Sequence, residues 1–250
     1  MPTITTRLAL FISCLLLVPS AMAEQTVVLV SDPWPPYIVG KLGEEANDGT
    51  TIEVIKLIFA EVDGLEVSLP LTPWNRALKS VKEGAADGIQ MLRKTKERET
   101  YMVFTNRVFL SREQLWYSQQ QFTDGFHWQT IDDLKPYVIG VVDGYSYSEI
   151  MDDALATKQL TAVKARDADQ LFAMLAAGRI DVALASEAVG KSLARQYQDR
   201  QIIASDQAVA EEPHYIGIAK NTEAVKWIPD INRAIDKLMA NGSIDRIIYQ

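Results

Sequence analysis

Residues 87–109 read DGIQMLRKTKERETYMVFTNRVF. After its first residue the run Asp87–Leu92 is largely apolar, which predicts a buried strand. Five charged residues then fall within six positions, and a second run of alternating apolar residues follows: Arg93, Lys94, Lys96, Glu97 and Arg98, then residues 101–104. A strand that ends in a cationic loop can hold an anion, because the planar guanidinium of Arg matches a carboxylate. The alternative for each of these side chains is a solvated charged loop.

The first 23 residues have the three parts of a secretory signal peptide. A short start carries the positive charge of Arg7, Leu8–Val18 is apolar, and Ala21–Ala23 provides small residues for cleavage before Glu24. The apolar part is too short to span a membrane. We therefore expect export to the periplasm. Cys14, the single cysteine, lies in this segment, so the mature chain must rely on its hydrophobic core without a disulfide.

Charge and composition exclude several functions. The formal net charge is −8 with both signs dispersed along the chain, which argues against binding to nucleic acid or to an anionic membrane surface. No later apolar run approaches the length of a transmembrane helix. The two histidines, His127 and His214, lie outside any nucleophile, acid–base or metal motif, and there is no phosphate-binding loop. We therefore predict no cofactor, no metal site and no catalytic residue.

Strands followed by helices recur along the first half. The strand predicted at Gln25–Ser31 runs into a loop that three prolines hold extended, and residues 65–71 form a strand before the next helix. Parallel strands place the loops that follow them at one edge of the sheet, where open α/β sheets bind ligands. These loops present Trp34, Tyr37, Trp74 and Arg76. The alternative for the aromatic residues is that they close the end of a core.

The second half repeats this pattern without repeating its sequence. Strands are predicted at residues 138–142, 160–164 and 180–185, and a late strand at 215–219. Two α/β units of about 90 residues fit normal domain sizes. For the helix starts, we expect Thr50 or Thr51 to cap a helix over residues 52–62.

Three motifs together resemble family 3 solute-binding proteins, the periplasmic receptors of polar amino acid ABC transporters. Thr95–Arg98 followed by Phe104–Thr105 resembles the T-x-x-R…F-[ST] segment of that family. Residues 176–183, AAGRIDVA, resemble its helix-to-strand turn. Residues 138–148 resemble the glycine-containing turn of its second domain. The resemblance covers nearly all of the mature chain, with the motifs in the family's order.

The resemblance implies an α/β, two-lobed periplasmic-binding-protein fold of type II. Each lobe is a mostly parallel sheet flanked by helices, and the ligand lies in a cleft between the lobes. We expect residues 1–23 to be the signal peptide, 24–114 plus 213–250 to form lobe 1, and 115–212 to form lobe 2. The chain then crosses between the lobes near residues 115–118 and 209–213. Closure on the ligand is a hinge motion.

The resemblance also implies the ligand contacts. It assigns Arg98 to the ligand carboxylate and the aromatic walls to Trp34, Tyr37 and Trp74. The turn over residues 145–148 completes the carboxylate site with backbone N–H groups at a helix N-terminus. The full set of expected ligand-binding residues is Trp34, Tyr37, Trp74, Arg76, Gln90, Met91, Arg93, Arg98, Tyr145, Ser146, Tyr147, Ser186 and Glu187.

The chain departs from the family pattern at two places. Ser186 stands where many amino acid receptors have the Asp that binds the ligand ammonium. Glu187, which follows, either takes over that role or is a solvated acid at a helix start. Gln90, Met91 and Arg93 occupy the strand end where the family often has small hydroxylated residues. Arg93 is either a second cation for an acidic ligand or a surface residue.

The sequence thus predicts a periplasmic receptor rather than an enzyme. It is expected to bind a small carboxylate-bearing ligand, with an L-amino acid as the expected class, and to deliver it to an inner-membrane ABC permease. We expect a monomer that binds no nucleic acid. Two alternatives stay open: a dehydratase-like enzyme that uses Glu187 in the cleft, and a sensing module that acts on a separate signalling protein.

Overall fold

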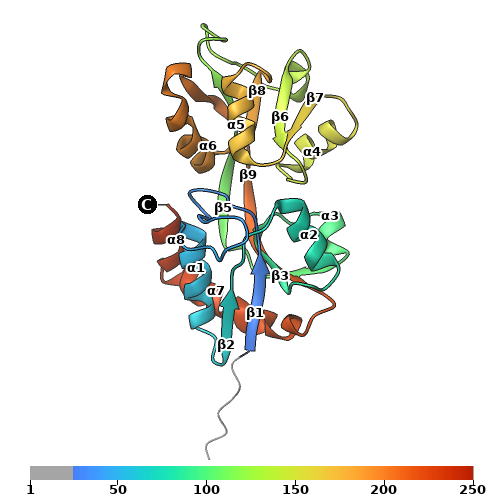
Figure 1. Cartoon of the computed structure of the whole chain (residues 1–250), viewed down its shortest axis with the longest axis vertical. Helices are drawn as coiled ribbons and strands as arrows, with labels where there is room; N and C mark the ends of the chain where they lie inside the picture. The colour runs from blue at the N-terminus through green and yellow to red at the C-terminus, as the bar shows by residue number, and fades with distance from the viewer. Residues whose placement is uncertain (1–24, 250) are drawn as a thin grey trace, which may run out of the picture.

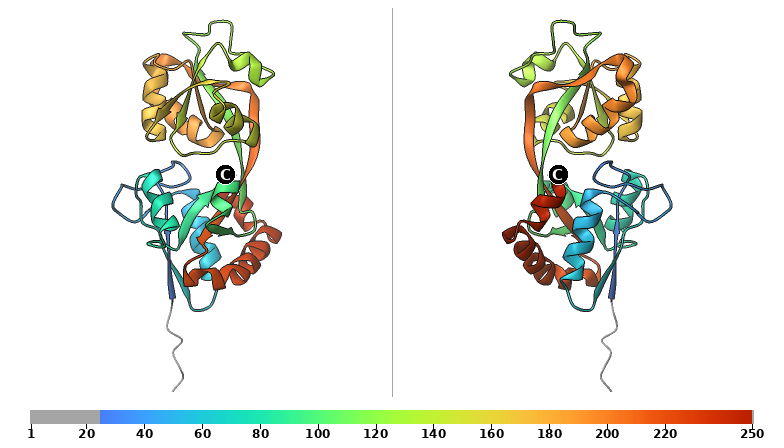
Figure 2. Two further views of the ribbon diagram at one scale, coloured as in Figure 1. Left: turned by 90° about the vertical axis from the view of Figure 1, so that its right-hand side faces the viewer. Right: turned by 90° about the vertical axis from the view of Figure 1, so that its left-hand side faces the viewer.

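The computed structural model describes residues 25–249, so the signal peptide expected at residues 1–23 lies outside the described residues. Figure 1 shows two lobes that are joined by the long strands β5 (Phe109–Ser118) and β9 (Ile202–Ala219). The side views of Figure 2 place these two strands along one side of the molecule.

The lower lobe in Figure 1, called lobe 1 here, contains elements from both ends of the described chain: β1 (Gln25–Val30), α1 (Thr50–Ala60), β2 (Leu65–Ser68), α2 (Trp74–Lys82), β3 (Gly88–Leu92), α3 (Lys96–Glu99), β4 (Met102–Phe104), the 3₁₀ helix η3 (Glu223–Trp227), α7 (Ile228–Ala240) and α8 (Ser243–Ile248). The upper lobe, lobe 2, contains η1 (Ile131–Leu134), β6 (Val138–Val142), α4 (Glu149–Ala156), β7 (Thr161–Ala165), α5 (Ala168–Ala176), β8 (Val182–Ser186), α6 (Glu187–Ala194) and η2 (Arg195–Arg200).

The strands pair in the order β2-β1-β3-β9-β5-β8-β6-β7, and β4 pairs with β9. Within lobe 1, β1 is parallel to β2 and β3. Within lobe 2, β6 is parallel to β7 and β8. β9 and β5 pair antiparallel to each other and to their neighbours. The parallel core of each lobe therefore follows the predicted strand–helix alternation.

The late strand is much longer than predicted. We expected it at residues 215–219, but β9 begins at Ile202. Its first part, IIASDQAVAEE, contains many polar residues and lacks an alternation of apolar and polar positions, because much of it is exposed and needs no buried face. Pairing with β5 from Ser118 back to Phe109 makes it a strand. The register of this pair shifts between Glu113 and Trp116, in the part that passes from one lobe to the other.

One aspartate in each lobe fastens the start of a parallel strand to its neighbour. The carboxylate of Asp87 accepts a hydrogen bond of 2.9 Å from the backbone N–H of Val28 in β1. In lobe 2 the carboxylate of Asp181 accepts one of 2.7 Å from the backbone N–H of Val138 in β6. These N–H groups lie where the parallel pairing begins, so the carboxylates supply acceptors that the sheet does not.

The start of α1 differs from the prediction. Gly49 is the N-cap residue, and neither threonine side chain caps the helix. The hydroxyl of Thr51 instead donates to the backbone oxygen of Tyr37 at 2.8 Å, which fixes the proline-rich loop. Gly49 has a φ of 117°, and a Cβ atom there would lie 2.3 Å from the same oxygen. The close approach of this loop to α1 therefore requires glycine.

We predict that Asp181→Ala lowers the free energy of unfolding by about 1–2 kcal/mol, because it leaves the N–H of Val138 without its acceptor. Urea denaturation of the purified protein measures this change. Asp124→Ala, at an exposed loop position of the same lobe, is the matched control and should change stability by less than about 0.5 kcal/mol. Equal effects of the two substitutions would contradict the role of Asp181.

Candidate functional site

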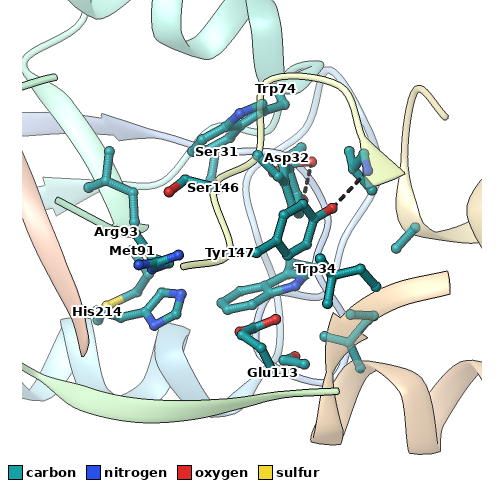
Figure 3. Close-up of a pocket in the computed structure, with 18 of the residues that line it drawn as sticks. Ser31, Asp32, Trp34, Trp74, Met91, Arg93, Glu113, Ser146, Tyr147 and His214 are labelled. Atoms are coloured by element: carbon teal, nitrogen blue, oxygen red, sulfur yellow. Dashed lines mark hydrogen bonds between the residues drawn. The ribbon is translucent and has the colours of Figure 1, made fainter. Parts of the chain in front are cut away.

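A cavity lies between the lobes, with walls from both (Figure 3). The loop after β1, α2 and the end of β3 face it from lobe 1, and the turn after β6, α5, and the junction of β8 with α6 face it from lobe 2. The connecting strands contribute Glu113 and His214. Nine of the expected ligand-binding residues line this cavity: Trp34, Trp74, Met91, Arg93, Arg98, Tyr145, Ser146, Tyr147 and Ser186.

Four of the expected residues lie elsewhere. Tyr37 is buried and packs against Trp34, with ring centroids 4.5 Å apart. Gln90 is fully buried, and its amide donates to the backbone oxygen of Leu29 at 3.2 Å. Arg76 is exposed on α2. Glu187 accepts from Lys191 one helical turn later, which favours the solvated acid at a helix start over a ligand contact.

Aromatic rings line the cavity on two sides. Trp34 stacks on the imidazole of His214 with centroids 5.2 Å apart, and His214 stacks in turn on Phe109 at 4.8 Å. From the other direction, Trp74 meets Tyr145 edge-to-face at 5.3 Å. The two tryptophans thus lie at different sides of one cavity, each held by another ring. Such rigid rings provide large apolar contact area for a ligand.

The backbone oxygen of Gly144 joins the lobes. It accepts a hydrogen bond of 2.8 Å from Trp74 Nε1 and one of 3.0 Å from Arg98 Nη2, both in lobe 1. Gly144 has a φ of 80°, and a Cβ atom there would lie 2.4 Å from Asn75 Oδ1. The Tyr145 hydroxyl adds a second link, donating to Asp32 Oδ2 at 2.7 Å. The lobes are therefore in direct contact across the cavity.

Arg98 is buried and held from several sides. The Thr95 hydroxyl caps the short helix α3 by accepting from the backbone N–H of Arg98. Besides its bond to Gly144, the guanidinium donates from Nη1 to the backbone oxygen of Arg93 at 2.7 Å and lies 5.4 Å from the centre of the Trp74 ring. Burial lowers the pKa of Arg98 from its usual value. Its cation thus faces the cavity at a place where an anion would offset the loss of water.

Arg93 is not a surface residue, and that alternative is wrong. Its side chain is nine-tenths buried and lines the cavity. Nη2 forms an ion pair of 2.5 Å with Glu212 of β9. The position follows directly from β3, whose residues are all buried, so the strand carries the side chain into the interior.

The hydroxyl groups of the turn after β6 are already engaged. Ser146 donates to Asp152 at 2.6 Å, and Ser148 caps α4 by accepting from the backbone N–H of Met151. The Tyr147 hydroxyl accepts from the backbone N–H of Val142 at 2.8 Å. These contacts hold the turn in one conformation, as a preformed ligand site requires.

Two buried acids in the cavity were missed by the sequence analysis. Asp32 and Glu113 are both almost fully buried, and burial raises the pKa of each to about 7. Glu113 accepts from the Ser111 hydroxyl at 2.6 Å. A signal was present for Glu113, because it lies in phase with Phe109 and Ser111 on the inward face of β5.

His214 was also missed, because its segment carried no strand pattern. Its Nδ1 faces the backbone oxygen of Glu212 at 3.3 Å, so Nδ1 donates and Nε2 is the acceptor of the neutral ring. Burial between Trp34 and Phe109 lowers the pKa of His214 to about 3. The imidazole is therefore neutral throughout the physiological range.

Remaining apolar positions complete the lining. They come from both lobes and are Leu92, Val142, Ala168, Leu171, Leu184, Ala185 and Val189, with Ser31 beside them. Within residues 25–249, no helix is long and apolar enough to cross a bilayer. The same residues contain no cluster of three or more His, Cys, Asp or Glu side chains suited to a metal ion.

A two-lobed α/β fold with a partly polar, aromatic cavity at the lobe interface defines a class of small-molecule-binding proteins. The pattern of the bacterial extracellular solute-binding proteins, family 3, matches residues 26–250, and the chain belongs to this family. It is similar to the histidine-binding periplasmic protein of Salmonella typhimurium strain LT2, with 22% identity over 251 residues that cover 96% of this chain and 95% of that protein.

Solved structures show the same fold. An ancestral arginine-binding protein bound to arginine has a TM-score of 0.75 and 18% identity, over 90% of this chain and 97% of that one. An amino acid ABC transporter substrate-binding protein from Streptococcus pneumoniae, bound to L-arginine, has a TM-score of 0.74 and 22% identity, over 90% and 93% of the two chains. The α/β periplasmic-binding-protein fold expected from the sequence is confirmed.

The raised pKa of Glu113 predicts a pH-dependent stability. Since the folded pKa of about 7 exceeds the ordinary 4.5, the folded state holds the proton more tightly than the unfolded chain. The contribution to stability is fully present below pH 4.5 and is lost as the pH rises through 7. Glu113→Gln imitates the protonated acid, so at pH 8 the variant should be more stable than the wild type by on the order of 2 kcal/mol, and about equally stable at pH 5.

Melting temperatures of wild type and Glu113→Gln at the two pH values measure this difference, and the effect of His214 cancels because both proteins contain it. Glu66→Gln, at an exposed position of β2, is the control and should give no pH-dependent difference. A variant whose advantage is the same at pH 5 and pH 8 would show that Glu113 does not titrate in this range.

Proposed function

We propose that the protein is a periplasmic receptor that captures a small carboxylate-bearing ligand between its lobes. The observation that carries this proposal is the placement of Arg98. Its buried guanidinium faces a cavity walled by Trp34 and Trp74, at the junction of two lobes. An Arg in such a low-dielectric site binds carboxylates through charge-assisted hydrogen bonds. Relatives with the same fold bind amino acids, which supports an L-amino acid or a related acid as the ligand class.

Ligand capture would use lobe closure. Gly144 contacts Arg98 and Trp74 in the closed arrangement described here, so opening the lobes breaks these hydrogen bonds. A ligand held by both lobes adds contacts that exist only when they are closed, and it shifts the population toward closure. We place lobe 1 at residues 24–114 plus 213–250 and lobe 2 at residues 115–212. The hinge then lies in the β5–β9 pair, near the shift of register after Glu113.

In the proposed pathway, the signal peptide directs the chain to the periplasm, and the closed monomer presents its ligand to an inner-membrane ABC permease. Membership in a family of extracellular solute-binding proteins supports this role. We propose binding without chemical turnover. Glu187 does not line the cavity, so it is not placed to act as a catalytic acid there. A dehydratase-like enzyme would have to use Asp32 or Glu113 instead. Incubation with prephenate-like acids, followed by product analysis, should show no conversion.

We predict that Arg98→Ala lowers the affinity for the ligand by on the order of a thousandfold, because it leaves a buried carboxylate without its cation. A thermal-shift screen against amino acids and small carboxylic acids identifies the ligand, and calorimetry then measures its affinity for each variant. Lys94→Ala, at the half-exposed neighbouring cation, is the matched control and should bind normally. A folded Arg98→Ala protein with unchanged affinity would overturn the assignment.

We also predict that tryptophan emission shifts when the ligand identified by this screen binds, because Trp34 and Trp74 line the cavity. Trp34→Phe and Trp74→Phe should each reduce the shift. Trp227→Phe should keep it, since Trp227 bonds to Gln25 at the start of β1 and does not line the cavity. Emission that stays constant in every one of these proteins would argue against ligand binding between the two tryptophans.

A further inference from the structure

Arg93 carries donors that the described chain leaves unpaired. The residue is 9% exposed and lines the cavity. Nη2 is paired with Glu212, but Nε and Nη1 are buried and have no hydrogen-bond partner among residues 25–249. Buried N–H groups of a cation are costly to leave unpaired, so a site built this way favours a ligand that offers acceptor oxygens.

The Ser186 hydroxyl, which also lines the cavity, is a second polar group without a geometrically good hydrogen bond. Ser186 is 2% exposed and lines the cavity, and its Oγ lies near the Tyr37 hydroxyl without forming a hydrogen bond of good geometry within the described chain. It stands directly opposite Glu113 in the pairing of β5 with β8. After burial and the Ser111 hydrogen bond, the charges of Arg93 and Glu212 also affect the pKa of Glu113, Arg93 lowering it and Glu212 raising it. The unpaired groups of Arg93 and Ser186 are therefore both associated with Glu113, on the side of the cavity that faces the connecting strands.

The charges that face the cavity favour an anion rather than a second cation. Arg98 lies beside Arg93, since its Nη1 donates to the backbone oxygen of Arg93. Burial raises the pKa of the acids that line the cavity, Asp32 and Glu113, to about 7, so both are protonated below that pH and only partly ionised near it. His214 is neutral, so it adds no charge. A ligand ammonium would have to ionise one of the buried acids, whereas a ligand carboxylate meets cations that are already charged.

We infer that the cavity takes a short-chain ligand with two carboxylates, one bound by Arg98 and the other by the free N–H groups of Arg93. This inference rests on the proposed function and narrows its ligand class. The hydroxyl of Ser186, and the carboxyl group of Glu113 when it is protonated, supply further donors for the second carboxylate. Two kinds of small molecule carry two carboxylates in this way: a plain dicarboxylate such as glutarate, and an acidic amino acid such as L-glutamate.

Calorimetry on the wild-type protein with matched acids tests the ligand class. Succinate, glutarate and L-glutamate carry two carboxylates. L-glutamine has an amide of the same size in place of one carboxylate of L-glutamate, and butyrate is glutarate without its second carboxylate. We expect glutarate to bind at least ten times more tightly than butyrate, and L-glutamate at least ten times more tightly than L-glutamine. Comparing glutarate with L-glutamate shows whether the amino group contributes.

The outcomes separate the two proposals. If butyrate or L-glutamine binds as tightly as its dicarboxylate partner, the receptor function stands and the two-carboxylate inference falls. If none of these acids binds but the thermal-shift screen finds another amino acid or monocarboxylic acid, the receptor function likewise stands and the two-carboxylate inference falls; a screen that finds no ligand at all would overturn both. Lowering the pH from 8 to 6 should strengthen glutarate binding, because Glu113, which faces Ser111, Arg93 and Ser186, gains its proton in that range, as does Asp32 beside Tyr145.

Arg93→Gln tests the residue itself. It should weaken glutarate binding by about a hundredfold and leave butyrate, held by Arg98, within about threefold, so the preference for two carboxylates is lost. Because this variant leaves Glu212 unpaired, Arg93→Gln/Glu212→Gln provides a neutral pair and should give the same loss. Arg107→Gln removes one exposed positive charge and should retain the preference. A folded Arg93→Gln protein that keeps the preference for glutarate would overturn the inference.

Discussion

The antiparallel pairing of β5 with β9 is the constraint on which the rest of the structure depends. These strands belong to both lobes, so every contact across the cavity is possible only because they hold the lobes at one side. The register shift after Glu113 lies in the same stretch as the inward-facing Glu113 and His214. The element that connects the lobes therefore also forms the back wall of the binding cavity, which couples lobe orientation to cavity chemistry.

On the opposite side of the cavity, a single backbone oxygen connects the two lobes. Gly144 accepts from Trp74 and Arg98 at once, and a side chain at this position would collide with Asn75. In the proposed receptor, the guanidinium of Arg98 would both contact the other lobe and bind the ligand carboxylate, and these two roles would compete for its N–H groups. Arg93, with one nitrogen atom paired and two free, faces no such competition. Of these two adjacent cations, Arg98 donates to the other lobe, whereas Arg93 keeps two nitrogen atoms without a hydrogen-bond partner in the described chain.

The amino-acid sequence predicts the position of the cavity better than the chemistry of its lining. Rigid loops after strands placed Trp34 and Trp74 correctly at the edge of the sheets, since parallel topology requires it. The motif around Arg98 was found because its residues are contiguous. Asp32 directly follows the strand predicted at Gln25–Ser31, but nothing in the local sequence indicates that Tyr145 from the other lobe will cover it. For the same reason the sequence does not decide whether Arg93 is a ligand-binding cation or a surface residue, since its ion-pair partner Glu212 is 119 residues away.

By itself the sequence determined the parallel strand–helix order, the working loops at one sheet edge and the cationic segment that follows β3, because each depends on residues close in the chain. Only the tertiary structure decided which charges are buried. The length of β9, the stacking of His214 between Trp34 and Phe109, and the raised pKa of Glu113 all arise from segments that meet after folding. Burial removes water from a charge, and no local pattern records which distant segment will do so.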